Sequence, residues 1–362
     1  MHWVILALLL AQLSILAWNA FYWRSRRAPV NEPNARISIL IPARNERHNL
    51  PHLLSALAGQ SFATFEILVC DDHSDDETAK WLADNAERLG VQWFPADPRP
   101  DGWMGKNWAC HLLARRATGE WLLFLDADLR PKPEFMDWIA RRLGDDAPAL
   151  VSGFPRPRPA STAAGLLEAM VPFSVLTTLP IQPAEQNRHP ALAFAHGQMI
   201  AMRRRDYERL QPHERKRAKV LEDVEVARLV KREGGRLQIL DASGVVDVSM
   251  YAGLRDAIDG FSKNAVPICG GSIHSAALIA VVLAATYLLP IALLPFRPVW
   301  MGLAVILAAL NFGGSSGMIR LPRLYGLLYP VAMVLAEITI IRSIGWHARG
   351  VLKWKGRTYR IR

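Results

Sequence analysis

Apolar residues follow two different patterns along this chain. No charged residue occurs from Trp3 to Trp23, and no acidic residue occurs between Asp259 and Glu337, a span rich in Leu, Ala, Val and Ile. Between about residues 36 and 263, short apolar runs are separated by charged segments, as in an ordinary soluble domain. The pattern therefore predicts one soluble domain between apolar terminal regions.

The N-terminal apolar run, residues 3–23, is expected to be a transmembrane anchor. A cleaved signal peptide is the alternative, but the run has no charge before its apolar part and no small-x-small cleavage site. Arg24, Arg26 and Arg27 follow it, and basic flanks mark the cytoplasmic side of a membrane. The N-terminus is therefore expected outside and the middle domain in the cytosol.

The C-terminal apolar region offers three candidate spans, at about 274–295, 299–318 and 326–345. Three crossings after a cytosolic domain would leave the basic C-terminal tail outside, against the positive-inside rule. One candidate is therefore expected to be re-entrant or interfacial, and the Gly-rich segment 310–317 is the first choice. Residues 160–180 contain two prolines and Glu168, which favours an interfacial helix over a span.

The middle region reads as strands that alternate with helices. Strands are expected at 36–43, 65–72, 91–96 and 120–128, and helices at 49–60, 75–90, 106–119 and 221–235. This order is typical of an α/β domain with a mostly parallel sheet. Such sheets bind their ligands at the carboxyl ends of the strands.

Three of the expected strands end in polar clusters. These are Arg44-Asn45-Glu46, Asp71-Asp72 and Asp126-Ala127-Asp128. A carboxylate at the end of a buried strand is costly unless a hydrogen-bond donor, a cation or a ligand compensates its charge. The sequence therefore predicts a binding site at this edge of the sheet.

Asp126 and Asp128 have the spacing to share a ligand. On an extended strand, residues i and i+2 point to the same side, roughly 6.5–7 Å apart. A hard divalent cation takes oxygen ligands and often accompanies substrate phosphates, so this pair favours a metal that holds a nucleotide diphosphate. The alternative is an acidic turn after a buried strand.

The other acids are open to two interpretations. Asp71 and Asp72 could cap the following helix or could accept hydrogen bonds from a base or ribose. Glu222 and Asp223 open a helix, where acids favour the N-terminal dipole, but one of them could be a general base. Lys106 follows Gly105 at a helix start and could meet a phosphate, although no Walker spacing is present.

Charge and cysteine content narrow the functional class. The net charge is +10, and basic residues flank the apolar segments, which favours an anionic membrane surface over nucleic acid. No zinc-finger spacing or RRM-type motif occurs, so no nucleic-acid partner is expected. Three widely spaced cysteines agree with a reducing compartment.

Six stretches together resemble family 2 glycosyltransferases with the GT-A fold. They are ISILIPARNE, ILVCDDHSDDET, GWMGKNWAC, LFLDADLRPKPEF, GQMIAMRRRDY and LEDVEVARLVKREGGR, in the family's order over about residues 37–264. With GWMGKNWAC, the apolar ends and the terminal WKGRTY, the chain is most similar to the bacterial branch that acts on lipids. That branch includes the carotenoid (diaponeurosporenoate-type) and hopanoid-associated enzymes.

The resemblance implies a Rossmann-like GT-A catalytic domain and a role for each matching residue. Residues expected to bind the nucleotide sugar are Pro42, Arg44, Glu46, Asp71, Asp72, Lys106, Asp126 and Asp128. Asp126 and Asp128 match the D-x-D motif, which binds the nucleotide diphosphate with Mg²⁺ or Mn²⁺. Asp223 matches the catalytic base of an inverting transfer, with Glu222 beside it.

Two departures from the family limit the expected reaction. The Gln-x-x-Arg-Trp motif of processive members is absent, so transfer of one sugar is expected. Members of the lipid branch often have Gly-Gly-His before the base, and only His213 matches it here. The donor is expected to be a UDP-sugar and the acceptor a lipid or isoprenoid. The alternatives are sugar transfer to a polyprenyl phosphate and a non-catalytic relic of a nucleotide-binding domain.

The apolar and basic segments, taken together with the resemblance, predict the domain order and the location. Residues 1–24 are expected to be the anchor, 36–264 the catalytic domain, 265–346 a C-terminal membrane region and 347–362 a basic cytosolic tail. The expected location is the bacterial inner membrane, as a multi-pass protein with a cytosolic catalytic domain.

Overall fold

The computed structural model describes residues 2–26, 35–60, 65–144, 146–354 and 357–360 of the chain. The chain divides into two compact units. The helical unit comprises Met1–Ser25, Pro157–Ile181 and Ser249–Arg362, and the sheet unit comprises Arg26–Arg156 and Gln182–Val248. The segments 157–181 and 249–264, expected in the catalytic domain, thus pack with the apolar helices.

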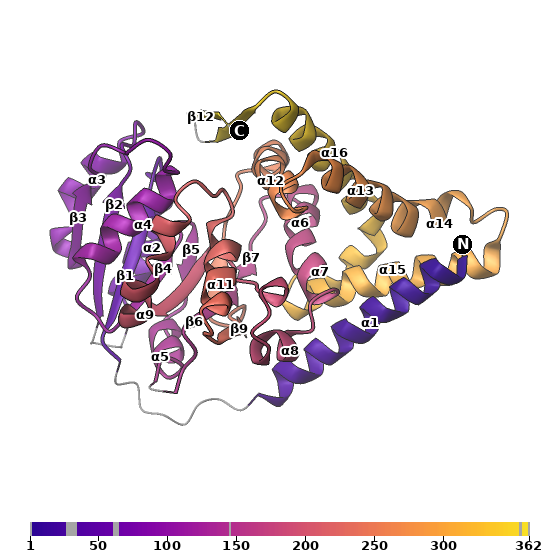
Figure 1. Cartoon of the computed structure of the whole chain (residues 1–362), viewed down its shortest axis with the longest axis horizontal. Helices are drawn as coiled ribbons and strands as arrows, with labels where there is room; N and C mark the ends of the chain where they lie inside the picture. Colours follow the sequence, from indigo (N-terminus) through magenta and orange to yellow (C-terminus); the bar gives the residue numbers. More distant parts are fainter. Residues whose placement is uncertain (1, 27–34, 61–64, 145, 355–356, 361–362) are drawn as a thin grey trace. The chain divides into compact units, whose positions relative to one another are not determined.

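The sheet unit is built on a seven-stranded, mostly parallel sheet, which confirms the expected fold class (Figure 1). The strand order is β3 (Val91–Pro95), β2 (Phe65–Asp71), β1 (Ile37–Ala43), β4 (Trp121–Leu125), β8 (Met199–Arg203), β6 (Leu150–Phe154) and β9 (Leu237–Asp241). Strands β3, β2, β1 and β4 are mutually parallel, whereas β8 runs antiparallel to both β4 and β6. The carboxyl ends of β1, β2 and β4 therefore meet at one edge.

The four helices expected in the sheet unit lie close to their expected positions, as α2 (Leu50–Ala58), α3 (Thr78–Asn85), α4 (Gly105–Arg116) and α11 (Glu222–Arg232). The structure adds four short helices that were not expected: α5 (Phe135–Ala140), α8 (Ile181–Gln186), α9 (Arg204–Leu210) and α10 (Pro212–Arg215). Helix α3 begins at Thr78, later than the expected residue 75, because Glu77 adopts a left-handed conformation with φ 67°. A second, three-stranded sheet is formed by β5 (Leu129–Pro131), β10 (Val246–Val248) and β7 (Arg156–Pro157).

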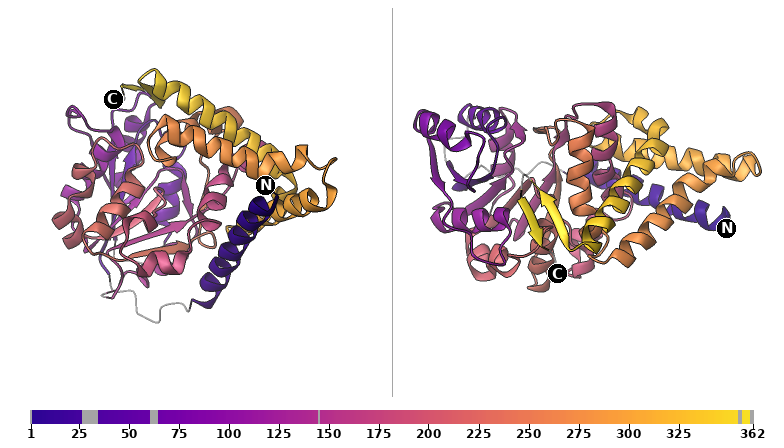
Figure 2. Two further views of the ribbon diagram at one scale, coloured as in Figure 1. Left: turned by 45° about the vertical axis from the view of Figure 1, so that its right-hand side comes forward. Right: turned by 90° about the horizontal axis from the view of Figure 1, so that it is seen from above.

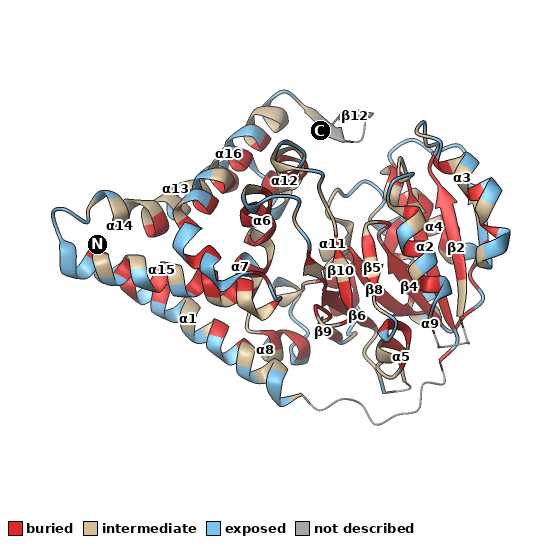
Figure 3. Ribbon diagram, turned by 180° about the vertical axis from the view of Figure 1, so that it is seen from behind, coloured by how far each residue is buried: buried red, intermediate tan, exposed pale blue. Residues whose placement is uncertain are grey.

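The core of the sheet unit explains the continuous apolar runs of the sequence. Every residue of β4 is buried, and β1 is buried except at Pro42 (Figure 3). Helices α4 and α11 contribute residues to the same apolar cluster, including Leu113 and Val230. A strand buried on both faces needs no polar alternation, so its sequence reads as an unbroken apolar run.

The helical unit contains four helices that are long and apolar enough to cross a membrane. They are His2–Ser25 (α1), Ile273–Ala292 (α13 Ile273–Leu283, η3 Ala284–Leu288 and α14 Leu289–Ala292), Pro298–Met318 (α15) and Arg323–Ala348 (η4 Arg323–Leu328 and α16 Tyr329–Ala348). Shorter helices α6 (Thr162–Glu168), α7 (Met170–Leu176) and α12 (Leu254–Ile268) complete the unit. At the C-terminus, β11 (Val351–Trp354) and β12 (Arg357–Arg360) form an antiparallel hairpin within the expected basic tail.

The Gly-rich segment 310–317, the first choice for a re-entrant or interfacial stretch, is helical throughout. These residues lie inside the unbroken helix α15. A Cβ atom at Gly313 would lie 2.6 Å from the carbonyl oxygen of Arg323 and 3.2 Å from the Cα atom of Gly326. The glycines therefore permit close packing of α15 against η4, the use that membrane helices commonly make of small residues.

Helix α1 is packed into the helical unit by polar contacts. Asn19 is fully buried; its Nδ2 atom donates to the carbonyl oxygens of Leu176 and Leu179, and its Oδ1 atom accepts from the amide of Ile181. Asn311 on α15 donates to the carbonyl oxygen of Leu9. The views in Figure 2 show α1 alongside α15. The N-terminal helix is thus a structural part of this unit as well as a candidate anchor.

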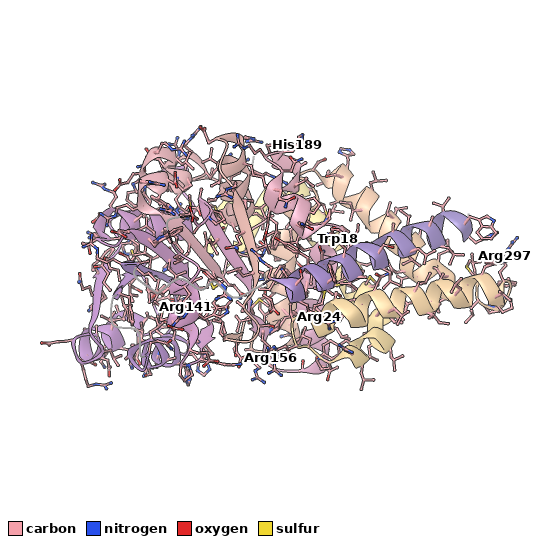
Figure 4. The ribbon with its side chains drawn as sticks, turned by 90° about the horizontal axis from the view of Figure 1, so that it is seen from below. Trp18, Arg24, Arg141, Arg156, His189 and Arg297 are labelled. Carbon is pink, nitrogen blue, oxygen red and sulfur yellow. The ribbon has the colours of Figure 1, made fainter. Side chains whose placement is uncertain are left out.

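The outer surface of the helical unit is apolar and has aromatic residues near its ends. Among the described residues, the exposed large apolar side chains all belong to this unit. Trp3 packs on Trp300 with ring centroids 4.5 Å apart, at the N-terminal ends of α1 and α15. Trp18 and Arg24 lie toward the other end of α1, far from Arg297 (Figure 4). This arrangement is typical of helices that face lipid.

Glu168, at the end of α6, is a buried acid without a partner. It is 1% exposed, and neither carboxyl oxygen makes a hydrogen bond to a described residue. Burial raises its pKa from 4.5 to about 7. Because the pKa is raised on folding, the proton stabilises the fold below about pH 4.5, and this contribution is lost as the pH rises through 7.

Substitution Glu168→Gln is therefore expected to raise the thermal midpoint of the full chain in detergent at pH 8. Removing a buried, unpaired carboxylate is expected to stabilise the fold by about 1–3 kcal/mol. At pH 5 the two proteins are expected to melt alike. The matched control is Glu208→Gln at an exposed position, which is expected to change neither midpoint. Equal midpoints for Glu168→Gln and wild type at both pH values would contradict the prediction.

Candidate active site

The polar clusters after β1 and β2 lie side by side because the two strands are parallel and in register. Ala43 pairs with Asp71, and the amide of Asp72 donates to the carbonyl oxygen of Ala43. Arg44 donates from Nη1 to the carbonyl oxygens of Asp72 and His73. Arg44 therefore holds the loop after β2 against the loop after β1.

Asp71 and Asp72 are both buried, and part of the capping interpretation applies to Asp71. Its carboxylate accepts from the amide and the hydroxyl of Ser74 and so closes the turn after β2. Glu46 accepts from Asn49 Nδ2 at 2.8 Å, at the entrance to α2. These contacts fix the shape of the edge that was expected to receive a nucleoside.

Asp126 and Asp128 lie in a turn, so the prediction that they share one face of an extended strand is wrong. Strand β4 ends at Leu125, and the amide of Leu129 donates to the carbonyl oxygen of Asp126. The chain turns here because Leu129–Pro131 leaves the main sheet to pair with β10. The amide of Asp126 also donates to the carbonyl oxygen of Gln198, which ties this turn to the loop before β8.

Glu222 and Asp223 form the first turn of α11, as expected. The Oδ1 atom of Asp223 accepts from the amide of Val224. Its Oδ2 atom lies against Gly197, where a Cβ atom would be only 2.8 Å away. Glycine at position 197 therefore allows the carboxylate of Asp223 to approach the loop before β8.

Lys106 joins the turn after β4 to the first turn of α11. Its Nζ atom lies 2.8 Å from Asp126 Oδ1 and 2.8 Å from Glu222 Oε1, and it donates to the carbonyl oxygen of Gly197 at 3.3 Å. Burial disfavours the charge of Lys106, but Asp126 and Glu222 hold its pKa well above the usual range. Three sequence-distant groups expected in the site are thus in direct contact.

A small pocket surrounds this contact. It is lined by Pro42, Lys106, Cys110, Phe124, Asp126, Gly197, Ile200, Met202, His213, Glu222 and Val226. Of the expected residues, Pro42, Lys106, Asp126 and Glu222 are in its wall, while Arg44, Glu46, Asp71, Asp72, Asp128 and Asp223 are outside the lining set. Cys110 and Gly197 were not among the expected site residues, although Cys110 ends the stretch GWMGKNWAC and Gly197 begins the stretch GQMIAMRRRDY.

The two histidines near the pocket are neutral. Burial lowers the pKa of His213 to about 3 and that of His196 to about 4. The hydroxyl of Tyr207 and Nδ1 of His213 are hydrogen-bonded at 2.8 Å. Lys106 is therefore the cation that meets the acids in this pocket wall.

Asp223 has the pKa of a usable base. Burial, followed by the adjacent charge of Glu222, raises the pKa of Asp223 to about 7, while Lys106 opposes the rise. Glu222 differs because its carboxylate is held directly by Lys106. The geometry therefore distinguishes two neighbouring acids that the sequence left equivalent.

The donor set fits a divalent cation that shares its ligands with a substrate. Among the described residues, no group of three or more His, Cys, Asp or Glu side chains is arranged so that it could hold a metal ion. Two carboxylates in one turn are too few to enclose a cation alone. They suit Mg²⁺ or Mn²⁺, which bind to one or two carboxylates together with substrate phosphates and water.

Comparison with known proteins shows that the chain is similar to glycosyltransferases. Residues 38–211 match the model of glycosyl transferase family 2. The chain is similar to a 4,4'-diaponeurosporenoate glycosyltransferase of Staphylococcus haemolyticus, with 28% identity over 241 residues, 64% of this chain and 62% of the relative. It is also similar to an undecaprenyl-phosphate 4-deoxy-4-formamido-L-arabinose transferase of Enterobacter sp., with 33% identity over 106 residues, 27% of this chain and 31% of the relative. The chain thus spans less than two thirds of the length of each.

A solved structure shares the fold. A mannosyltransferase from Pyrobaculum calidifontis, in complex with GDP-Man and Mn²⁺, superposes with a TM-score of 0.57 at 18% identity, covering 96% of this chain and 98% of that chain. The sheet unit accordingly has the GT-A glycosyltransferase fold.

Proposed function

We propose that this chain, which carries a glycosyl transferase family 2 domain with the GT-A fold, moves one sugar from a nucleotide-sugar donor to a lipid or isoprenoid acceptor, with inversion at the anomeric carbon. The observation that carries the proposal is the joining of the Asp126 turn to the α11 acids through Lys106. This contact joins the turn proposed to bind the diphosphate to the first turn of α11, in which Glu222 precedes Asp223, whose pKa is raised to about 7.

Asp223 is the proposed general base, with Glu222 as its positioning neighbour. Asp223 takes the proton of the acceptor hydroxyl, and the acceptor oxygen forms a bond to the anomeric carbon of the donor. The bond between that carbon and the diphosphate breaks, and its electron pair leaves with the diphosphate. A pKa of about 7 leaves much of Asp223 deprotonated in a neutral cytosol.

The donor is proposed to lie along the edge formed by β1, β2 and β4. Nucleotide-sugar-binding residues are proposed to be Pro42, Arg44, Glu46, Asp71, Asp72, Lys106, Asp126 and Asp128. Asp126 and Asp128 would hold Mg²⁺ or Mn²⁺ together with the diphosphate. Such a cation, when bound, neutralises charge on the departing diphosphate. We propose a UDP-sugar as the donor.

The helical unit supports a membrane-embedded acceptor. Its four long apolar helices and its exposed apolar surface would keep the enzyme at a bilayer, where an oily acceptor is concentrated. The relatives named above are bacterial proteins whose names specify an isoprenoid acid and a lipid phosphate as acceptors. We propose a multi-pass protein of the bacterial inner membrane with its catalytic unit in the cytosol.

The proposed function is tested by incubating membranes that contain the full-length protein with a panel of radiolabelled nucleotide sugars. We expect the label to move into one extractable lipid, in the presence of Mg²⁺ or Mn²⁺. Membranes that contain the Asp223→Asn protein are the control and are expected to give little labelled lipid. Alkali and mild acid treatment of the product would identify a sugar phosphate linkage if the acceptor is a polyprenyl phosphate.

Two outcomes would contradict the proposal. If the label appeared only in a water-soluble product or a polymer, the lipid acceptor would be wrong. If no nucleotide sugar were bound or consumed by wild-type membranes, the chain would instead carry a non-catalytic relic of the fold.

A further inference from the structure

The ammonium group of Lys106 is fully used in the described structure. Its three N–H groups have three oxygen acceptors: Asp126 Oδ1 and Glu222 Oε1, both at 2.8 Å, and the carbonyl oxygen of Gly197 at 3.3 Å. The side chain of Glu222 is 12% exposed and that of Asp126 is 28% exposed, so solvent screens this contact only in part. Lys106 thus occupies the oxygen-rich position beside the expected metal ligand.

A divalent cation and the Lys106 ammonium cannot both bind Asp126 without strong repulsion. Mg²⁺ lies about 2.1 Å from its oxygen ligands. A cation on Asp126 Oδ1 would therefore lie within about 5 Å of Nζ, which is 2.8 Å from the same atom. A further anion placed between the two cations relieves this repulsion, and a diphosphate has the charge and the oxygens to do so.

We propose that Lys106 is an internal counter-ion that keeps free divalent cations off Asp126 until a nucleotide diphosphate arrives and takes over its ammonium group. The inference rests on the proposed function for the identity of the diphosphate. With Lys106 in this role, the metal and the nucleotide bind to the protein cooperatively rather than independently. It also means that Glu222 is released from Lys106 when the donor enters, so the first turn of α11 is rearranged only in the loaded enzyme.

The alternative role for Lys106 is a structural strut between α4 and α11. The two roles differ in the sign of one effect. A strut supports the whole site, so its loss weakens the binding of metal and of nucleotide alike. A counter-ion competes with the metal and attracts the nucleotide. Its loss therefore strengthens the binding of the metal and weakens the binding of the nucleotide.

The experiment measures binding of Mn²⁺ alone, and of UDP and GDP with Mn²⁺, to the full-length protein in detergent by titration calorimetry. Lys106→Met is expected to bind Mn²⁺ alone about tenfold more tightly than wild type, and UDP or GDP about tenfold more weakly. Lys106→Arg keeps the positive charge and is expected to resemble wild type in the Mn²⁺ titration. The thermal midpoint of each variant verifies that it is folded.

Two controls identify the site that is measured. Lys216→Met removes a cation that pairs at 3.0 Å with Glu225, which lies on α11 like Glu222, and is expected to leave both titrations unchanged. Adding Asp126→Asn to Lys106→Met is expected to abolish the gain in Mn²⁺ affinity. This double variant separates the Asp126 site from Mn²⁺ bound elsewhere on the protein.

The titrations have results that would overturn the counter-ion role of Lys106. Mn²⁺ binding to Lys106→Met that is equal to or weaker than that of wild type overturns the counter-ion role. An equal gain in Lys216→Met does so too, because the effect would then be one of general charge. If wild type binds neither UDP nor GDP, the proposed function fails, whereas the Mn²⁺ comparison still decides whether Lys106 excludes the metal.

Discussion

Substitution Asp223→Asn is expected to lower kcat for sugar transfer about 10²–10⁴-fold, the usual contribution of a general base. The amide keeps the size of the side chain and its contact with the Val224 amide, but it cannot accept the proton of the acceptor. The KM for the donor is expected to change little, because Asp223 acts on the acceptor. Initial rates with saturating nucleotide sugar and extracted lipid product provide the measurement.

The pH dependence of kcat is an independent test of Asp223 as the general base. Burial raises the pKa of Asp223 to about 7, so the base is protonated below that pH and deprotonated above it. The rate of wild type is therefore expected to rise with pH through about 7 and then level off. The residual rate of Asp223→Asn is expected to lose this rise.

The helix that carries Asp223 offers a matched control. Glu225 lies in the same first turn, but its carboxylate is held by Lys216 and Arg228. Glu225→Gln is expected to change kcat less than about threefold, in line with a partly exposed ion pair. If Asp223→Asn kept its rate while Glu222→Gln lost it, the assignment of the base would have to move to Glu222.

Substitution Asp128→Asn is expected to lower kcat/KM about 10²–10³-fold at a fixed, moderate Mn²⁺ concentration. The physical reason is that a metal ion stabilises the charge on the departing diphosphate in the transition state by several kcal/mol. An amide remains an oxygen ligand but has no negative charge, so higher Mn²⁺ is expected to restore part of the rate. The measurement is a titration of the transfer rate with Mn²⁺ for both proteins.

A carboxylate elsewhere in the sheet unit controls for the loss of one negative charge. Asp137 on α5 pairs with Arg141 one helical turn later, and Asp137→Asn is expected to leave the Mn²⁺ dependence unchanged. Asp126→Asn is expected to act like Asp128→Asn and in addition to loosen Lys106. An unchanged rate and unchanged Mn²⁺ dependence in Asp128→Asn would exclude it as a ligand.

The sheet was predictable from local sequence because its strands are buried on both faces. Residues 121–125 and 37–41 contain almost only apolar side chains, and such short runs between helical patterns predict parallel strands. Helix α11 was predictable for a similar reason: acids open it and two glycines follow it. The turn at Asp126 was missed because it depends on the pairing of Leu129 with Val248, a contact that no local pattern records.

The contacts within the site could not be derived from spacing. Lys106, Asp126 and Glu222 come from a helix start, a strand end and a second helix start, and only the packed sheet brings them together. The resemblance to a family supplied the residues, but not the direct bridge between them. The roles of all the expected nucleotide-binding residues, of the base and of the metal ligands stay predictions.

The role of a glycine in the helical unit depends on a partner that the local sequence does not show. Gly313 belongs to the segment that was the first choice for a re-entrant or interfacial stretch. In the structure it makes room for Gly326, which lies thirteen positions later and faces it across a close helix contact. The sequence shows that position 313 has no side chain, but it does not show that Gly326 packs closely against it.

The position of Asn19 and Leu9 has a consequence for biosynthesis. Helix α1 is translated before its partners: Asn311, whose side chain donates to the carbonyl oxygen of Leu9, follows about 300 residues later. At the usual rate of 5–20 residues per second, roughly 15–60 s pass before that donor exists. The partners of Asn19, at residues 176–181, are translated about 160 residues after it, so the proposed anchor would have to hold this polar side chain with temporary partners for roughly 8–32 s.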